Sequence, residues 1–194
     1  MKHFSKILLS ILIVSYSCNL NAQKVINILP LGNDNLDVVK IIETAVKEFY
    51  GYKCVILSKA PLTSDILANS KTRYEASKIL AKYNSNKNLL IITEKDIACK
   101  KGSINEWGIF GLGYRPGTTC VVSTFRIKKN VPTKIFHERL KKICLHEIGH
   151  NLGLNHCSSG DNRCMMNDAN GTIREVDQEK IFFCNKCWSF LRKS

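Results

Sequence analysis

The sequence predicts an α/β fold with a mixed, largely parallel sheet and a long central helix. Three observations support this prediction. Short apolar segments typical of strands alternate with segments whose apolar residues recur at helical spacing. A region rich in glycine and aromatic residues then interrupts the alternation, and a longer helical segment follows it. Strands that alternate with helices favour parallel pairing, because each helix can serve as the crossover between two strands.

The N-terminal half supplies the alternating elements. Strands are expected at 24–30, 52–57 and 89–93, the last being almost continuously apolar. Helices are expected at 35–50, where Gly51 is a stop signal, and in the second half of 62–83. The apolar positions predicted to face the core are Leu36, Val39, Ile41, Ile42, Ala45, Val46 and Phe49 in the first helix and Tyr74, Ala76, Ile79, Leu80 and Tyr83 in the second.

The glycine- and aromatic-rich region spans 107–117 and precedes a further strand at 118–125. No helix follows these glycines and no Gly-Lys-Ser/Thr is present, which argues against a phosphate-binding loop. An exposed edge strand that borders a cleft fits better, and such a strand can pair with an extended substrate. The sequence leaves open whether Cys99 and Cys120, which flank this region, form a disulfide.

The central helix is expected to begin at Pro132 and Thr133. Phe136, Leu140, Cys144, Ile148 and Leu152 recur every four residues and form its buried stripe, so Cys144 is interpreted as a core residue. His146 and His150 point to nearly the opposite side. His137 has no partner at ligand spacing. It is interpreted as a surface residue or as one that contacts the metal ligands without binding the metal.

The chemistry of the chain is indicated by the stretch H-E-I-G-H-N-L-G-L-N-H, from His146 to His156. Two histidines one helical turn apart can reach one metal ion, with Glu147 beside it. Gly153 can take the left-handed conformation that ends a helix, which brings His156 back as a third ligand. Three protein ligands leave one tetrahedral position open, which is typical of catalytic zinc.

Four cysteines follow this motif: Cys157, Cys164, Cys184 and Cys187. Two lie before and two after an apolar segment, and the last pair is a C-x-x-C, so the spacing suits a closed four-cysteine zinc site that staples a small subdomain. The alternatives are two disulfides, which pair Cys157 with Cys164 and Cys184 with Cys187, or a redox-active C-x-x-C.

The block from His146 to Cys187 resembles the archaemetzincins, a branch of the metzincin zinc peptidases. The resemblance is carried by H-E-x-x-H-x-x-G-x-x-H followed directly by Cys, then C-x-M, seventeen residues and C-x-x-C. It departs from the family pattern in one place, since six residues rather than four separate Cys157 from Cys164. The resemblance implies a metzincin-like α+β fold, with an active-site helix, an edge strand at the cleft and a C-terminal subdomain stapled by zinc.

The resemblance also implies two zinc ions per chain and a role for each site residue. His146, His150 and His156 would bind the catalytic zinc, and the four cysteines the structural one. Glu147 would act as general base and later as general acid, and Met166 would occupy the turn beneath the metal. Some metzincins have a tyrosine soon after this methionine. Asn167 and Asp168 stand here instead, so the zinc itself is expected to stabilise the oxyanion.

Residues 1–22 have the layout of a secretory signal peptide: basic Lys2 and Lys6, a short apolar run from Ile7 to Val14, and a small residue, Ala22, at the expected cleavage site. Lipoprotein anchoring at Cys18 is the less favoured alternative. The mature chain, 23–194, is then expected to be one catalytic domain with subdomains 23–152 and 153–194, exported to the periplasm or secreted, without stable membrane insertion.

The net charge of +13 comes mostly from lysines scattered along the chain. This distribution favours a solvated surface over a nucleic-acid interface, which would need clustered basic and aromatic residues. The sequence therefore predicts a secreted zinc-dependent peptidase that acts on peptides or proteins. The alternative is an inactive zinc-stabilised binding protein. Glu147 argues against it, because a purely structural zinc site needs no general base.

Overall fold

The computed structural model describes residues 24–33 and 36–193, and the predicted signal peptide lies outside these residues. Its main sheet has the strand order β2-β1-β4-β8-β7, in which the first four strands are parallel and β7 is antiparallel to β8. A second sheet has the order β3-β5-β6. In chain order the elements are β1 (Val25–Leu31), α1 (Leu36–Tyr50), β2 (Lys53–Ile56), the 3₁₀ helix η1 (Ser64–Ile66), β3 (Tyr74–Glu75), α2 (Ala76–Lys82), β4 (Leu89–Thr93), β5 (Ile97–Lys101), β6 (Ile104–Ile109), β7 (Gly111–Gly113), β8 (Thr119–Ser123), α3 (Thr133–Asn151), α4 (Ile173–Gln178) and α5 (Asn185–Leu191).

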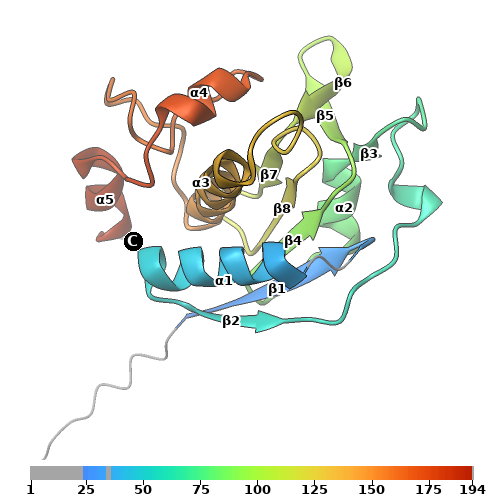
Figure 1. Ribbon diagram of the computed structural model, residues 1–194, viewed down its shortest axis with the longest axis horizontal. Coiled ribbons are helices and arrows are strands. Elements are labelled where there is room, and N and C mark those ends of the chain that lie inside the picture. The colour runs from blue at the N-terminus through green and yellow to red at the C-terminus, as the bar shows by residue number, and fades with distance from the viewer. Residues whose placement is uncertain (1–23, 34–35, 194) are drawn as a thin grey trace, which may run out of the picture.

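Helices cover both faces of the main sheet, as Figure 1 shows, with α1 and α3 on one side and α2 on the other. Neighbouring residues of β4 point to opposite faces: Leu90 and Ile92 pack with α1 and α3, whereas Leu89 and Ile91 pack with α2. A strand buried on both faces has to be apolar at every position, which explains the continuous run in β4. The predicted α/β class with a largely parallel sheet is confirmed.

Three expectations about individual elements were wrong. Leu36 is 60% exposed, because it is the first residue of α1 and Val38 takes the place in the core instead. Tyr74 belongs to the short strand β3 rather than to a helix. The region 107–117 is two elements: its first residues end β6, which forms a hairpin with β5, and only Gly111–Gly113 form the edge strand.

Residues 154–193 contain two short helices, α4 and α5, and no strand. An aromatic cluster fixes this segment against α1. The ring of Phe183 packs edge-on against Phe49 with the centroids 4.9 Å apart, and Trp188 stacks on Phe49 at 5.6 Å. Across the described part of the chain, no helix combines the length and the apolar character that a membrane span requires.

Candidate metal centres and active-site cleft

The three histidines predicted to be metal ligands come together at the C-terminal end of α3. His146 and His150 lie one turn apart, with ring centroids 4.6 Å from each other. The Nδ1 atom of His146 lies 2.5 Å from the carbonyl oxygen of Met165, and that of His150 lies 2.7 Å from the carbonyl oxygen of Leu154. A carbonyl only accepts, so both Nδ1 atoms carry the proton and both Nε2 atoms keep a free lone pair for a metal.

Gly153 turns the chain so that His156 faces the other two histidines. Its φ is +96°, in the left-handed region that favours glycine, and its N–H donates to the carbonyl of His150 at 2.8 Å. The His156 ring centroid is 4.9 Å from that of His150 and 5.5 Å from that of His146. One ring nitrogen from each of the three histidines lies within 4.8 Å of the others, which suits one shared ion.

Burial keeps the first two histidines neutral. It lowers the pKa of His146 to about 3, with further lowering by the neighbouring His150. Burial is also the main cause that lowers the pKa of His150. Because a metal competes with protons for the imidazole lone pair, neutral rings at physiological pH are ready to bind zinc.

Glu147 is buried next to the histidines, and its carboxyl group lacks hydrogen-bond partners within the part of the chain that the structure describes. Its side chain is 6% exposed, and its Oε2 atom has no hydrogen-bond partner among the described residues. Burial raises the pKa of this carboxyl to about 8. The edge strand β7 passes so close that a β-carbon placed on Gly111 would lie 2.6 Å from Glu147 Oε1. Glycine at position 111 therefore leaves the space that the Glu147 carboxylate occupies.

Met166 is fully buried and packs against the α3 helix at Gly149. A β-carbon added at Gly149 would lie 2.7 Å from the Met166 sulfur, so a larger residue at this position would have to displace the Met166 side chain. The preceding residue, Met165, supplies the carbonyl that orients His146. The turn therefore supports the helix by packing and positions one candidate ligand by a backbone hydrogen bond.

A cleft of about 390 Å³ opens over this site. The edge strand β7 and the β5–β6 hairpin form one wall, α3 the floor, and the segments 167–171 and 176–179 the other wall. The prediction of an edge strand that borders the cleft is confirmed. Five charged residues that the sequence analysis did not single out also line the cleft: Lys100, Lys101, Arg115, Lys142 and Glu179.

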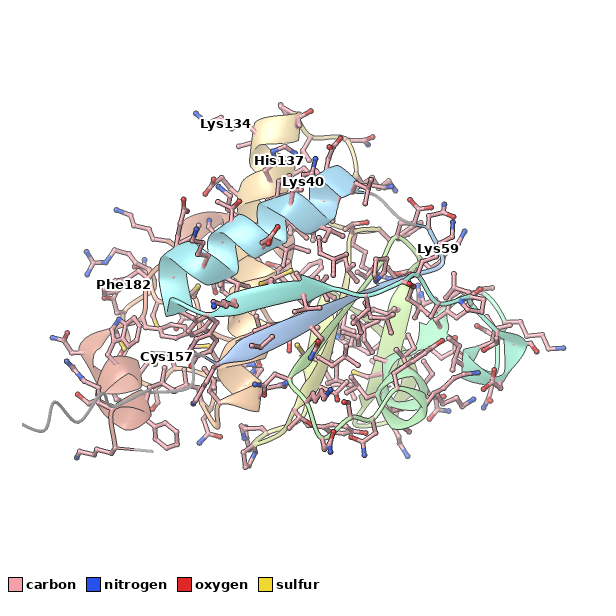
Figure 2. The ribbon with its side chains drawn as sticks, turned by 90° about the horizontal axis from the view of Figure 1, so that it is seen from below. Lys40, Lys59, Lys134, His137, Cys157 and Phe182 are labelled. Carbon is pink, nitrogen blue, oxygen red and sulfur yellow. The ribbon has the colours of Figure 1, made fainter. Side chains whose placement is uncertain are left out.

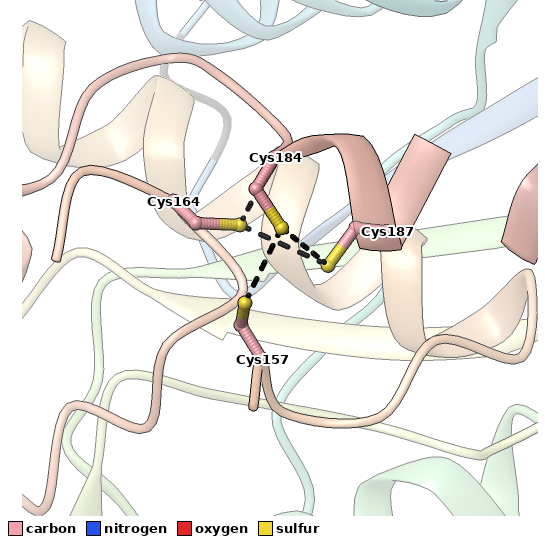
Figure 3. Close-up of side chains that lie close together, drawn as sticks. All are labelled: Cys157, Cys164, Cys184 and Cys187. Carbon is pink, nitrogen blue, oxygen red and sulfur yellow. Dashed lines mark hydrogen bonds between the residues drawn. The ribbon is translucent and has the colours of Figure 1, made fainter. Parts of the chain in front are cut away.

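The four predicted cysteines converge beside α5, as Figure 3 shows. The sulfur of Cys184 lies 3.5 Å from that of Cys157 and 3.7 Å from that of Cys187, and Cys164 lies 3.8 Å from Cys187. All four are free thiols, which rules out the disulfide alternative in this structure. Zinc–sulfur bonds of about 2.3 Å in a tetrahedron place the sulfurs about 3.8 Å apart, so the cluster has the size of a four-cysteine zinc site.

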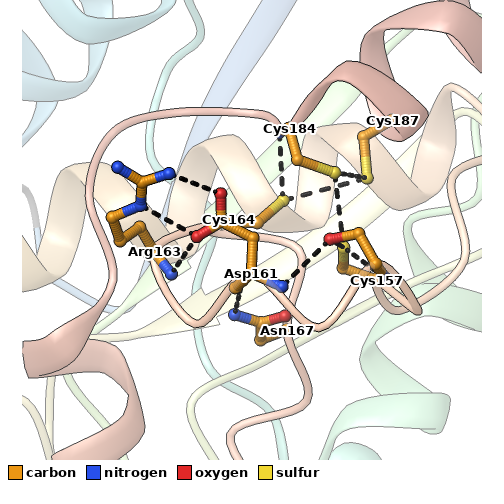
Figure 4. A network of polar contacts seen from close by, with 8 residues as sticks. Cys157, Asp161, Arg163, Cys164, Asn167, Cys184 and Cys187 are labelled. Carbon is orange, nitrogen blue, oxygen red and sulfur yellow. Dashed lines mark hydrogen bonds and ion pairs between the residues drawn. The ribbon is translucent and has the colours of Figure 1, made fainter.

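The loop between Cys157 and Cys164, longer than the family pattern, is held by its own polar contacts (Figure 4). Arg163 pairs with Asp161 through two hydrogen bonds of 2.9 and 2.8 Å. The side-chain amide of Asn167 donates to the backbone carbonyl of Asp161 at 3.0 Å. The two additional residues are therefore accommodated without separating the cysteines.

The remaining cysteines and His137 lie outside both clusters. Cys99 and Cys120 are free thiols in different sheets, so the disulfide that the sequence left open is not formed. Cys144 is fully buried, as expected for a core residue. Figure 2 shows His137 near Lys134 on the first turns of α3, far from Cys157, and Lys40 and Lys59 on separate parts of the surface.

Comparison with known proteins agrees with this geometry. The family model for Peptidase family M54 matches residues 78–193. An archaemetzincin of Archaeoglobus fulgidus is 30% identical over 158 residues, which cover 81% of this chain and 93% of that protein. One of Halobacterium salinarum is 28% identical and covers 84% of this chain and 96% of that protein.

The fold is shared with a solved structure as well. The crystal structure of the Archaeoglobus fulgidus archaemetzincin, complexed with malonate, superposes with a TM-score of 0.74 at 29% identity and covers 85% of this chain and 98% of that chain. The range matched by the family model includes the α3 helix, both residue clusters and the strands β4, β7 and β8 of the main sheet. The chain therefore belongs to peptidase family M54, the archaemetzincin family of zinc metallopeptidases.

Proposed function

We propose that this zinc metallopeptidase hydrolyses peptide bonds with Glu147 as the general base and then the general acid. The observation that carries the proposal is the buried Glu147 carboxylate, whose Oε2 atom has no partner and which adjoins the three histidines. A buried carboxylate without a partner is costly, so its presence calls for a function in proton transfer. The same observation disfavours an inactive binding protein, in which a purely structural site would need no base.

The catalytic ion would be held by His146, His150 and His156. The two oriented rings present Nε2, and three protein ligands leave a position for substrate or water. When bound, zinc supplies Lewis acidity, which acidifies water and polarises the peptide carbonyl.

Glu147 is placed to move the proton. Its carboxylate accepts a proton from the attacking water and later donates that proton to the leaving amine. The raised pKa of about 8, caused by burial, suits a group that must both take up and release a proton near neutrality. Gly111 keeps the carboxylate against the edge strand, where the peptide would pass.

The outer edge of β7 would align the substrate. This strand ends the main sheet, so one of its edges pairs with β8 and the other has no strand partner among the described residues. An extended peptide that adds to this edge would run along the cleft above α3. Its scissile bond would then lie between Glu147 and the histidines.

A second zinc ion would fill the four-cysteine cluster and contribute to folding rather than to chemistry. Closed tetrahedral sulfur sites are typical of structural zinc, and the segment they tie together has two short helices and no strand. We therefore propose a content of two zinc ions per chain.

Chelation tests the proposal. The protein as purified is expected to contain two zinc ions per chain by elemental analysis and to cleave members of an unbiased peptide library. Removal of the more labile ion by a chelator should abolish cleavage, and added zinc should restore it. A protein with two zinc ions that cleaves no peptide would contradict the proposed activity, and cleavage that resists complete zinc removal would contradict the mechanism.

We also propose that residues 1–22 direct export and that the chain is cleaved after Ala22. The support is the basic, apolar and small-residue layout of the segment. Expression of the full chain in a bacterial host, followed by fractionation and N-terminal sequencing, tests this. A mature chain that begins at Gln23 outside the cytoplasm is expected, a lipid-modified Cys18 would favour anchoring, and an uncleaved cytoplasmic chain would contradict export.

A further inference from the structure

Two buried charged residues line the cleft beside the histidines and have no part in the proposed hydrolysis. Lys142 precedes His146 by four residues, so the helix places both on the same face. Glu179 follows α4 on the opposite wall. Their side chains are only 8% and 6% exposed, respectively. Charged side chains buried to this degree are normally paired, so their presence in the cleft requires an explanation.

Neither group is satisfied by the protein. The Lys142 ammonium donates to the carbonyl of Val176 at 2.9 Å, which uses one of its three protons. Among the described residues, the Glu179 carboxylate accepts no hydrogen bond and forms no direct ion pair, although Lys142 is near enough to act on it electrostatically. Burial raises the pKa of Glu179 to about 8 and lowers that of Lys142. Both residues therefore have bonding capacity left on the side of the cleft.

The lining of the cleft also includes apolar residues next to the two charged groups. They include Ile143 from α3 and Val176 from α4. A side chain that enters here would thus meet apolar walls first and then, at the polar end, one donor and one acceptor. This combination is typical of pockets that select ligands by a few placed polar groups.

We propose that Lys142 and Glu179 select a substrate side chain with an uncharged carboxamide head, that of asparagine or glutamine. This inference rests on the proposed peptidase function. The carboxamide oxygen would accept from Lys142, and its NH₂ group would donate to Glu179. Above about pH 8, where Glu179 is ionised, Glu179 would repel an acidic head group and Lys142 a basic one. An apolar side chain would leave both buried groups unpaired.

Opposite charge changes in the pocket should shift the preference in opposite directions. In a positional peptide library assayed above pH 8, where Glu179 is ionised, the wild-type protein is expected to prefer Asn or Gln at the one position that enters this pocket. Lys142→Gln leaves Glu179 unopposed and should shift the preference to Lys and Arg. Glu179→Gln leaves Lys142 unopposed and should shift it to Asp and Glu. Each shift is expected to be roughly tenfold in kcat/KM, the scale of a charged hydrogen bond.

Matched variants control for charge and folding. Lys141→Gln on α3 and Glu48→Gln on α1 remove the same charges at positions that do not line the cleft, and they should leave the preference unchanged. The zinc content of all four variants should stay at the wild-type value, which shows that the shift arises in the pocket. Lys142→Gln should unfold at a lower temperature, because it loses the hydrogen bond to the Val176 carbonyl.

A binding measurement decides the inference independently of turnover. Short peptide hydroxamates that carry Gln, Glu, Lys or Leu next to the zinc-binding group are titrated into the zinc-loaded protein. Tighter binding of the Gln compound, with the order reversed toward Lys or Glu in the two variants, supports the inference even if no peptide is cleaved. Absence of cleavage with this binding order would overturn only the proposed activity. Equal binding of the four compounds, no binding, or a preference that neither variant shifts would overturn the selectivity.

Discussion

Replacement of Glu147 by glutamine is expected to reduce kcat/KM for peptide hydrolysis by about 10²- to 10⁴-fold, the usual contribution of a general base. The amide has nearly the same size as the carboxyl group, so it fits the space that Gly111 leaves for it. It cannot accept the proton of the attacking water or return one to the leaving amine. Because Glu147 is not one of the proposed ligands, the zinc content should stay at the wild-type value. Steady-state kinetics and elemental analysis on the same preparation measure both quantities.

Glu138→Gln is the matched control for this change. Glu138 lies on the same helix, about two and a half turns earlier, and its 43% exposed side chain pairs with Lys141 outside the cleft. Loss of this surface pair should leave kcat/KM within a factor of two. If Glu147→Gln keeps full activity with normal zinc content, another group must move the proton, and the proposed role of Glu147 is wrong.

The sequence predicted those parts of the fold that depend on periodicity. A strand buried on both faces has to be apolar throughout, and β4 was found at its exact bounds, 89–93. The helix that carries the motif was equally clear, since its buried stripe and the histidines repeat with the helical period on different sides. The β5–β6 hairpin was missed because Ile97–Lys101 and Ile104–Ile109 lack a regular apolar alternation.

The residues of both clusters were identified from their spacing in the sequence. The groups that orient these residues or make room for them were not. The carbonyls of Met165 and Leu154 orient two histidines, and any residue type offers a carbonyl, so no sequence signal marks them. Gly111 and Gly149 each make room for a side chain distant in sequence. Glu179 reaches the cleft only because α4 packs on α3, a tertiary contact that local pattern does not encode.

The histidine cluster and the cysteine cluster are connected through the backbone between His156 and Met166. His156 and Cys157 are neighbours in the chain, and Cys164 lies two residues before Met166. The N–H of Cys157 donates to the carbonyl of Met166 at 2.6 Å. The cysteine cluster therefore fixes both ends of the loop that carries His156 to the catalytic site and Met166 to its position beneath it.

Replacement of Cys164 by serine is expected to affect both centres because of this connection. Loss of one sulfur should release the proposed structural zinc, so that elemental analysis gives one ion per chain instead of two. The free energy of unfolding should fall by more than about 4 kcal/mol, as is typical when a metal site is lost. With the loop less well held, the affinity of the three histidines for zinc should drop by about 10- to 100-fold, the range seen when groups that orient metal ligands are removed.

Cys54→Ser is the control, because Cys54 is a half-buried thiol on β2 that belongs to neither cluster. It should leave the zinc content at two ions and the metal affinity unchanged. Competition with a calibrated chelator measures the affinity of the catalytic site in each variant, and denaturant unfolding measures stability. If Cys164→Ser loses one ion but the remaining site binds zinc as tightly as in the wild type, the two centres are independent, and His156 is held by Gly153 and the α3 helix alone. A weakened catalytic site would instead mean that the peptidase motif functions as one unit from His146 to Cys187, because the structural ion would then set the position of the third catalytic ligand.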